Sequence, residues 1–137
     1  MQRPIDKHTA LIFTMVLISA AEGEMTDAEL ETIGRQVRYL PVFREFDHQR
    51  LTEVGRDCAE LLRDEDGLDL ACDMIAEALP QPLRETAYAL ACDVAAADGV
   101  LASAELEVLS LLRRRLNVDR LVAAAIERAT YARHAIL

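Results

Sequence analysis

The chain has no tryptophan, only three phenylalanines and three tyrosines, and few residues that break helices, with five glycines and four prolines among 137 residues. Its apolar residues, 52% of the total, are mainly Ala, Leu, Val and Ile. Ala and Leu favour helices, and sparse Gly and Pro leave room only for short connections. We therefore expect an all-α fold, a single compact bundle of about seven helices in one domain over residues 1–137. That length can bury a core without covalent cross-links.

The chain also lacks net positive charge, because 24 acidic residues outnumber 15 Lys and Arg to give a formal charge of −9. Residues 57–107 form an acidic centre, whereas the segment from Arg113 onward is basic. Phosphate contacts need positive charge, and the basic end has no interleaved aromatic residues on which bases could stack. Nucleic acid is therefore not an expected partner.

Disulfide bonds are not expected, because Cys58, Cys72 and Cys92 are odd in number and widely spaced. Each lies in an apolar helical segment, which predicts buried free thiols. Free thiols are typical of a reducing compartment, so the sequence favours a cytoplasmic location.

A long hydrophobic run is missing too: the uncharged stretch at 9–21 is too short to span a bilayer as a helix. With Arg3 and Lys7 before it and small residues at its end, it also resembles a secretory signal. However, Asp6 interrupts the positive region, and a similar segment recurs later in the chain. We therefore favour a buried helix over an export signal or a membrane span.

Motifs for catalysis are absent from the sequence. It contains no nucleophile elbow, no glycine-rich phosphate loop and no HExxH zinc motif. His8, His48 and His134 are scattered without the spacing of metal ligands. We therefore do not expect an enzyme.

What the chain does contain is a segment used twice. Residues 19–33, SAAEGEMTDAELETI, align with residues 95–109, AAADGVLASAELEVL, and both copies contain the tetrapeptide AELE. Each copy predicts a buried apolar helix, a turn at Gly23 or Gly99, and a second helix. The bundle is therefore expected to contain two related helix-hairpin units.

Apolar periodicity and the breakers between periodic segments predict seven helices in all. Their ranges are 6–22, 27–39, 48–63, 68–79, 83–98, 103–116 and 118–134. Thr26 and Glu29 fit a capping box at the start of the second helix. Phe43 and Phe46 are expected in the core. The sixth helix is expected to point a leucine stripe inward, which consists of Leu106, Leu109, Leu112 and Leu116.

The second copy resembles the end of an EF-hand calcium loop. With Gly99 at the sixth position, Glu105 falls at the twelfth, where an EF-hand has its bidentate glutamate. The first and third positions, however, are Val94 and Ala96, which carry no side-chain oxygen, and the first copy is equally apolar there. An EF-hand is therefore excluded.

Each hairpin still carries two carboxylates, one at the end of its first helix and one at the start of its second. They are Glu22 and Glu29, then Asp98 and Glu105. Carboxylates together with the free carbonyl oxygens of a helix end suit a hard divalent cation. If the hairpins pack about a pseudo-twofold axis, all four carboxylates could share one face. In the alternative, Glu29 and Glu105 only begin helices, and the other two acids are solvated.

At these residues the chain resembles the TerB family, small α-helical proteins associated with tellurite resistance. The resemblance lies in the hairpin motif, here AAEGEMTDAE at 20–29 and AAADGVLASAE at 95–105. It implies a roughly seven-helix fold and a membrane-associated protein partner in a stress complex. It also implies a divalent cation, left open among calcium, magnesium, manganese and zinc, on Glu22, Glu29, Asp98 and Glu105. Two positions depart from the motif: Glu22 replaces Asp, and Ala102 replaces Ser or Thr.

Two further features have simpler interpretations. The tetrapeptide LACD occurs at 70–73 and 90–93. Because neighbouring side chains on a helix point about 100° apart, we expect packed cysteines beside solvated aspartates. The run at 113–115, three arginines, fans around its helix; it could pair with the acidic centre of a second copy or remain solvated. A homo-oligomer stays open on this basis.

Overall fold

The computed structural model describes residues 4–21, 23, 25–97 and 103–136. Within these ranges it contains seven α-helices, two short 3-10 turns and no strand. The α-helices are α1 (Lys7–Ala20), α2 (Asp27–Tyr39), α3 (Leu51–Leu61), α4 (Gly67–Ala78), α5 (Gln81–Ala95), α6 (Ser103–Arg115) and α7 (Arg120–Arg133). The prediction of an all-α bundle of about seven helices is confirmed.

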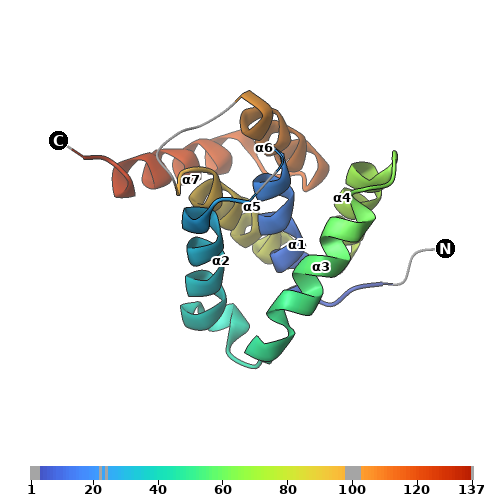
Figure 1. Ribbon diagram of the computed structural model, residues 1–137. Coiled ribbons are helices and arrows are strands. Elements are labelled where there is room, and N and C mark those ends of the chain that lie inside the picture. The colour runs from blue at the N-terminus through green and yellow to red at the C-terminus, as the bar shows by residue number, and fades with distance from the viewer. Residues whose placement is uncertain (1–3, 22, 24, 98–102, 137) are drawn as a thin grey trace.

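Helix α1 forms the centre of the bundle (Figure 1). Every residue at 10–19 is buried, because the helix contacts α2, α3, α4, α5 and α6. Its polar members are satisfied within the helix: the hydroxyl groups of Thr14 and Ser19 donate to the carbonyl oxygens of Ala10 and Met15 at 2.8 and 3.3 Å. The uncharged run near the N-terminus is therefore the core helix of this fold.

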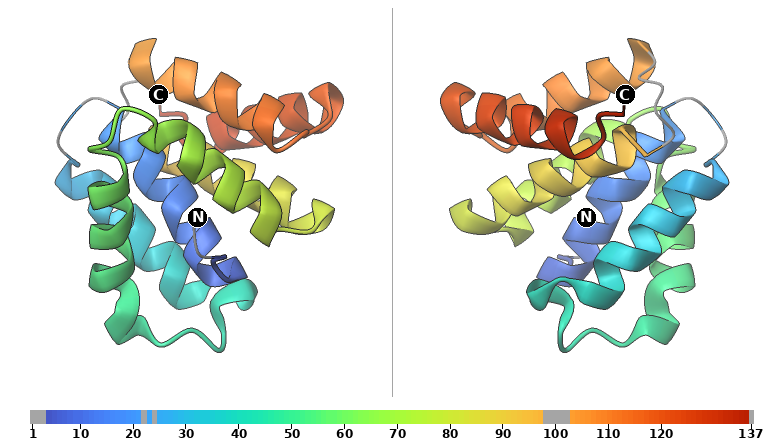
Figure 2. Two further views of the ribbon diagram at one scale, coloured as in Figure 1. Left: turned by 90° about the vertical axis from the view of Figure 1, so that its right-hand side faces the viewer. Right: turned by 90° about the vertical axis from the view of Figure 1, so that its left-hand side faces the viewer.

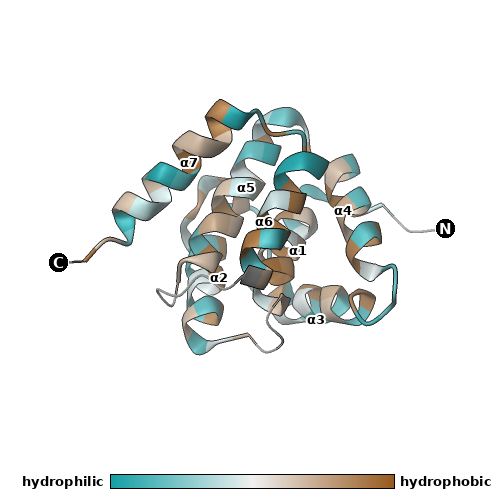
Figure 3. Cartoon of the chain, turned by 90° about the horizontal axis from the view of Figure 1, so that it is seen from above, coloured by the Kyte–Doolittle hydropathy of each residue, from teal (hydrophilic) through white to brown (hydrophobic). Residues whose placement is uncertain are grey.

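Helices α2 to α6 pack around α1, and α7 packs on α5. Seen from above, α7 lies along one edge of the bundle and α3 and α4 along the other, with α6 and α1 between them (Figure 3). Hydrophilic and hydrophobic segments alternate along these outer helices, as expected when one face of a helix packs on a core and the other meets water. Among the helices in the described ranges, none has both the length and the apolar character required to cross a bilayer.

The connection between α2 and α3 closes one end of the core. Phe43 and Phe46 are 1% and 7% exposed, which confirms their predicted place in the core. The ring of His8 lies 5.6 and 5.4 Å from theirs, and its Nε2 is 2.7 Å from the Val42 carbonyl oxygen. A 3-10 turn, His48–Arg50, precedes α3, so that α-helix begins three residues later than predicted.

The predicted leucine stripe of α6 is right in three positions and wrong in one. Leu109, Leu112 and Leu116 are buried, but Leu106 is 51% exposed. The inward position in the first turn is taken by Glu105, which is 1% exposed. Since the next residue points about 100° further round the helix, Leu106 faces outward.

The arginine run of α6 is partly tied down within the chain. Arg115 donates to Asp69 Oδ1 at 2.9 Å and also bonds the Asp73 carboxylate, so it joins α6 to α4. The hydrogen bond to Asp73 raises the pKa of Arg115, and the hydrogen bond to Asp69 raises it further. Partial burial of Arg115 acts in the opposite direction but is the weaker effect. The acidic partner of this arginine is therefore in its own molecule.

Candidate functional site

Glu29 lies in the first turn of α2. Its backbone N–H donates to Thr26 Oγ1 at 3.1 Å, and its Oε1 accepts from the Thr26 N–H at 2.9 Å. This reciprocal pair confirms the predicted capping box. The Glu29 side chain is only 2% exposed. A carboxylate here interacts favourably with the positive end of the helix dipole.

Glu105 occupies the equivalent position, the third residue of α6, and is 1% exposed. Counting this one, three positions of the two aligned sequences agree in their exposure to solvent. Leu30 and Leu106 are 55% and 51% exposed, and Ile33 and Leu109 are 3% and 8% exposed. At these three positions of the aligned sequences, α2 and α6 therefore agree in which residue is buried and which is exposed.

The other two predicted ligands, Glu22 and Asp98, lie outside the described residues, as does Gly99. Gly23 has a φ of +109°, which agrees with its predicted role in turning the chain. Among the residues that the structure describes, no group of three or more His, Cys, Asp or Glu side chains could hold a metal ion.

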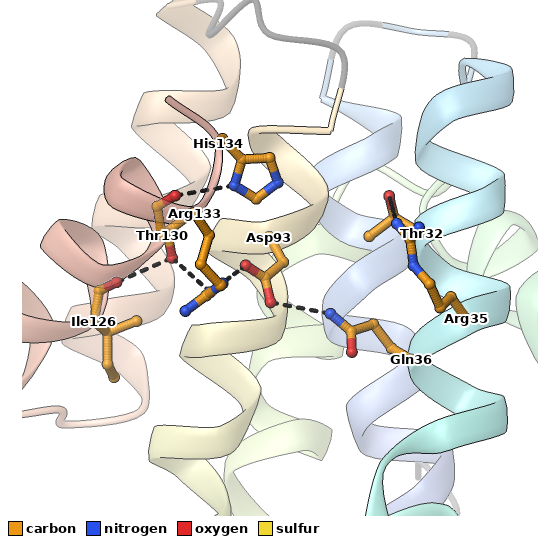
Figure 4. A network of polar contacts seen from close by, with 8 residues as sticks. All are labelled: Thr32, Arg35, Gln36, Asp93, Ile126, Thr130, Arg133 and His134. Atoms are coloured by element: carbon orange, nitrogen blue, oxygen red, sulfur yellow. Dashed lines mark hydrogen bonds and ion pairs between the residues drawn. The ribbon is translucent and has the colours of Figure 1, made fainter. Parts of the chain in front are cut away.

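The helix ends that carry the motif belong to one end of the bundle. Helices α1 and α5 contact each other, and their C-terminal ends lie on the same side of the molecule (Figure 2). The N-terminal end of α2 lies on that side too, as Figure 4 also shows from close by. Helix α6 contacts both α1 and α5. The two hairpins are therefore neighbours in the fold.

A polar network that the sequence did not predict joins three helices through Asp93 (Figure 4). Asp93 Oδ2 accepts from Gln36 Nε2 at 3.0 Å, and Oδ1 pairs with Arg133 Nη2 at 2.5 Å. The Asp93 side chain is 15% exposed, whereas that of Asp73, in the same LACD sequence, is 67% exposed. The expectation of solvated aspartates was wrong for Asp93, because α2 and α7 cover it.

A pocket of about 650 Å³ opens between α5, α6 and α7. Its apolar lining comes from Ala95, Ala96, Leu106, Leu109, Tyr131 and Ile136. Polar groups reach it from the same three helices and from the end of the chain: Tyr88, Cys92, Arg113, Glu127 and His134. The sequence carried no signal for this pocket, because the leucine pattern of α6 predicted that Leu106 points inward, whereas the structure exposes it.

Burial governs the chemistry at the floor of the pocket. Tyr88 is 2% exposed, and its hydroxyl donates to Glu127 Oε2 at 2.5 Å. Burial, reinforced by this carboxylate, raises the pKa of Tyr88. Burial also raises the pKa of the Cys92 thiol to about 12, with Glu127 and Asp93 adding to the shift. Both groups therefore stay protonated at neutral pH and act as neutral lining.

The three cysteines are free and buried, as predicted. The fold defines the class of protein: an all-α bundle around a buried first helix, in which the second and sixth helices each begin with a buried glutamate. The chain belongs to the family described as tellurite resistance protein TerB, whose family model matches residues 8–128. No curated protein and no solved structure matches the chain.

Proposed function

We propose that the protein is a non-enzymatic TerB-type module of tellurite and stress resistance. It binds a divalent cation through Glu22, Glu29, Asp98 and Glu105 and docks onto a protein partner. The observation that supports the cation is the pair of buried carboxylates, 2% and 1% exposed, at equivalent positions of two neighbouring hairpins. Carboxylate oxygens are the ligands that a hard divalent cation prefers, and one ion can take oxygens from several carboxylates.

The chemistry of the donors fits a hard cation. Four carboxylates favour calcium, magnesium or manganese, whereas structural zinc sites prefer Cys and His. The capping role of Glu29 is compatible with ligation, because Oε1 accepts the Thr26 N–H and a carboxylate has two oxygens with several lone pairs.

The alternative is a metal-free interaction scaffold whose motif acids only cap helices. The capping box of Thr26 and Glu29 favours it, since that interaction alone explains why a glutamate stands at the start of α2. In either case the family resemblance suggests a membrane-associated protein as the partner. The three buried free thiols suit a reducing compartment, so we propose that the module acts in the cytoplasm.

Calorimetric titration with calcium, magnesium, manganese and zinc tests the cation. We expect at least one metal to bind the wild type and to raise its melting temperature, because a ligand that binds only the folded state stabilises it. The double variant Glu29→Gln, Glu105→Gln should lose both effects, since glutamine keeps a capping carbonyl but not the charge. The control is Glu31→Gln, Glu107→Gln, which changes the exposed acids of the same two AELE sequences and removes the same net charge.

The scaffold alternative makes the opposite prediction. Two results together would remove the cation from the proposal. None of the four metals would give heat above that of buffer at sub-millimolar concentration, and metal would leave the melting temperature of the wild type and of each double variant unchanged. Equal loss of binding in both double variants would show that the effect is one of net charge and not of these two residues.

A further inference from the structure

We propose that the pocket between α5, α6 and α7 binds a small amphipathic anion, a molecule with an apolar aromatic or aliphatic body and one acidic head group. Neither of the described motif acids, Glu29 and Glu105, lines this pocket. Its volume of about 650 Å³ falls within the range of roughly 300–1,000 Å³ usual for small-molecule sites.

Large apolar side chains on one side of the pocket are exposed to solvent. Leu106, Tyr131 and Ile136 are 51%, 69% and 94% exposed, and all three line the pocket. Large apolar side chains gathered around one concavity mark a binding surface more often than scattered ones do. At the C-terminal end of α5, Ala95 and the capping residue Ala96 leave the space open because their side chains are small.

The polar half of the pocket selects the charge of the ligand. The Glu127 carboxylate accepts a hydrogen bond from the buried Tyr88 hydroxyl at 2.5 Å. The negative charge of Glu127 therefore already has a donor within the lining. Arg113, half-buried in the same lining, donates to the Val118 carbonyl oxygen at 3.4 Å. A guanidinium has five N–H donors, and this long bond occupies one of them. Arg113 therefore has donors for an acidic head group.

The spacing along α6 sets the size of the ligand. Leu106 and Arg113 are seven residues apart on one helix and line the same pocket. At 1.5 Å of rise per residue, the apolar and cationic parts lie about 10 Å apart along the helix axis. A body of two or three fused or linked rings, or a short acyl chain, with an acidic group at one end spans this distance. A concave lining of mixed polarity on three helices fits such a molecule better than it fits a flat protein surface.

The probe for this site is 8-anilinonaphthalene-1-sulfonate, and its partner probe is N-phenyl-1-naphthylamine, which has the same aromatic body without the sulfonate. Fluorescence titration gives affinity and stoichiometry, and amide chemical shifts locate the site. Ser110→Trp places a ring in the pocket from an exposed position, and Ala124→Trp adds the same ring at an exposed position of α7 outside the lining. Leu106→Glu is a second blocking variant, which repels the anion.

We expect one bound sulfonate probe per chain, with shifts confined to α5, α6, α7 and the residues after α7. Ser110→Trp and Leu106→Glu should abolish this binding, whereas Ala124→Trp should leave it unchanged. Arg113→Gln should weaken binding of the sulfonate probe about tenfold, the low end of the usual effect of losing a hydrogen bond to a charged group. It should leave the uncharged probe unchanged. Arg114→Gln, an exposed neighbour outside the lining, is the control for charge.

Three results would overturn the proposal. Equal binding to the two tryptophan variants would put the probe elsewhere. An equal effect of Arg113→Gln on both probes would remove the anionic head group from the ligand. A dimer that forms with rising concentration, and that Ser110→Trp but not Ala124→Trp prevents, would make a second copy of the chain the occupant.

Discussion

At the scale of the residue, a methyl group added at Gly67 would collide with the backbone of the preceding turn. Gly67 is the first residue of α4, and a Cβ there would lie 2.1 Å from the Leu61 carbonyl oxygen and 2.9 Å from Leu62 Cα. Both are backbone atoms, so neither can turn aside. We expect Gly67→Ala to lower the free energy of unfolding by about 1–3 kcal/mol, as overpacking does, and urea denaturation measures it.

The control for this prediction is Gly34→Ala in the middle of α2. An added Cβ there has no atom within 4 Å, so the substitution should instead raise the free energy of unfolding by about 0.5–1 kcal/mol. Equal effects of the two substitutions would contradict the close approach at the turn between α3 and α4.

Single residues also show where a sequence pattern misleads. A heptad-like spacing of leucines in α6 predicts an inward stripe, but Glu105 takes the inward position of the first turn and Leu106 turns out. The same exchange occurs in α2, where Glu29 is buried and Leu30 is exposed. Hydropathy alone would bury the leucine of each pair. The helix phase places the glutamate inward instead, and in α2 the capping box fixes Glu29 there.

At the scale of the element, Asp93 holds α7 and α2 against α5. We expect Asp93→Ala to lower the free energy of unfolding by about 1–2 kcal/mol, because it removes hydrogen bonds from Gln36 and Arg133 at a largely covered site. The expected loss of stability is not larger because the Arg133 side chain is 53% exposed and solvent weakens its ion pair with Asp93.

Asp73→Ala is the matched control, because Asp73 ends the other LACD sequence and its side chain is 67% exposed. Loss of its ion pair with Arg115 should lower the free energy of unfolding by less than about 1 kcal/mol.

Hydrogen exchange is a second measurement for Asp93→Ala. This variant should lower the protection of the amides of α7 selectively. Uniform loss of protection over all helices would argue against a local docking role.

At the scale of the whole molecule, the three buried thiols make the free energy of unfolding fall at high pH. Burial raises the pKa of Cys58, Cys72 and Cys92 to about 12, 11 and 12, from a reference of 9.0. The folded chain thus holds these protons more tightly than the unfolded chain. Their contribution to stability is complete below about pH 9 and is lost as pH rises toward 11–12. The urea midpoint should therefore fall above pH 9.

A variant with all three cysteines replaced by alanine should show a smaller fall over the same interval, whatever its absolute stability. At pH 8, a thiol reagent should modify the native wild type only as fast as the protein unfolds, and should modify denatured protein at once. Rapid modification of the native protein, or an equal pH dependence in the variant, would contradict burial of the thiols.

The sequence by itself determined the order and approximate limits of the seven helices, the capping box of Thr26 and Glu29, the buried thiols and the core positions of Phe43 and Phe46. These features depend on residues that are close in the chain, through periodicity, breakers and caps, or on strong burial preferences. It also identified the hairpin motif by which the chain resembled its family, although two of the four motif acids lie outside the described residues.

Only the tertiary structure decided which polar groups are shared between helices and where the pocket lies. Asp73 and Asp93 end the same four-residue sequence, and each bonds an arginine of a distant helix. Asp73 nevertheless stays 67% exposed, whereas Asp93 is 15% exposed because α2 and α7 pack over it. The pocket likewise needs side chains of α5, α6 and α7 together. Such partners are set by how the helices pack around α1, and that packing is a property of the whole chain and not of any one segment.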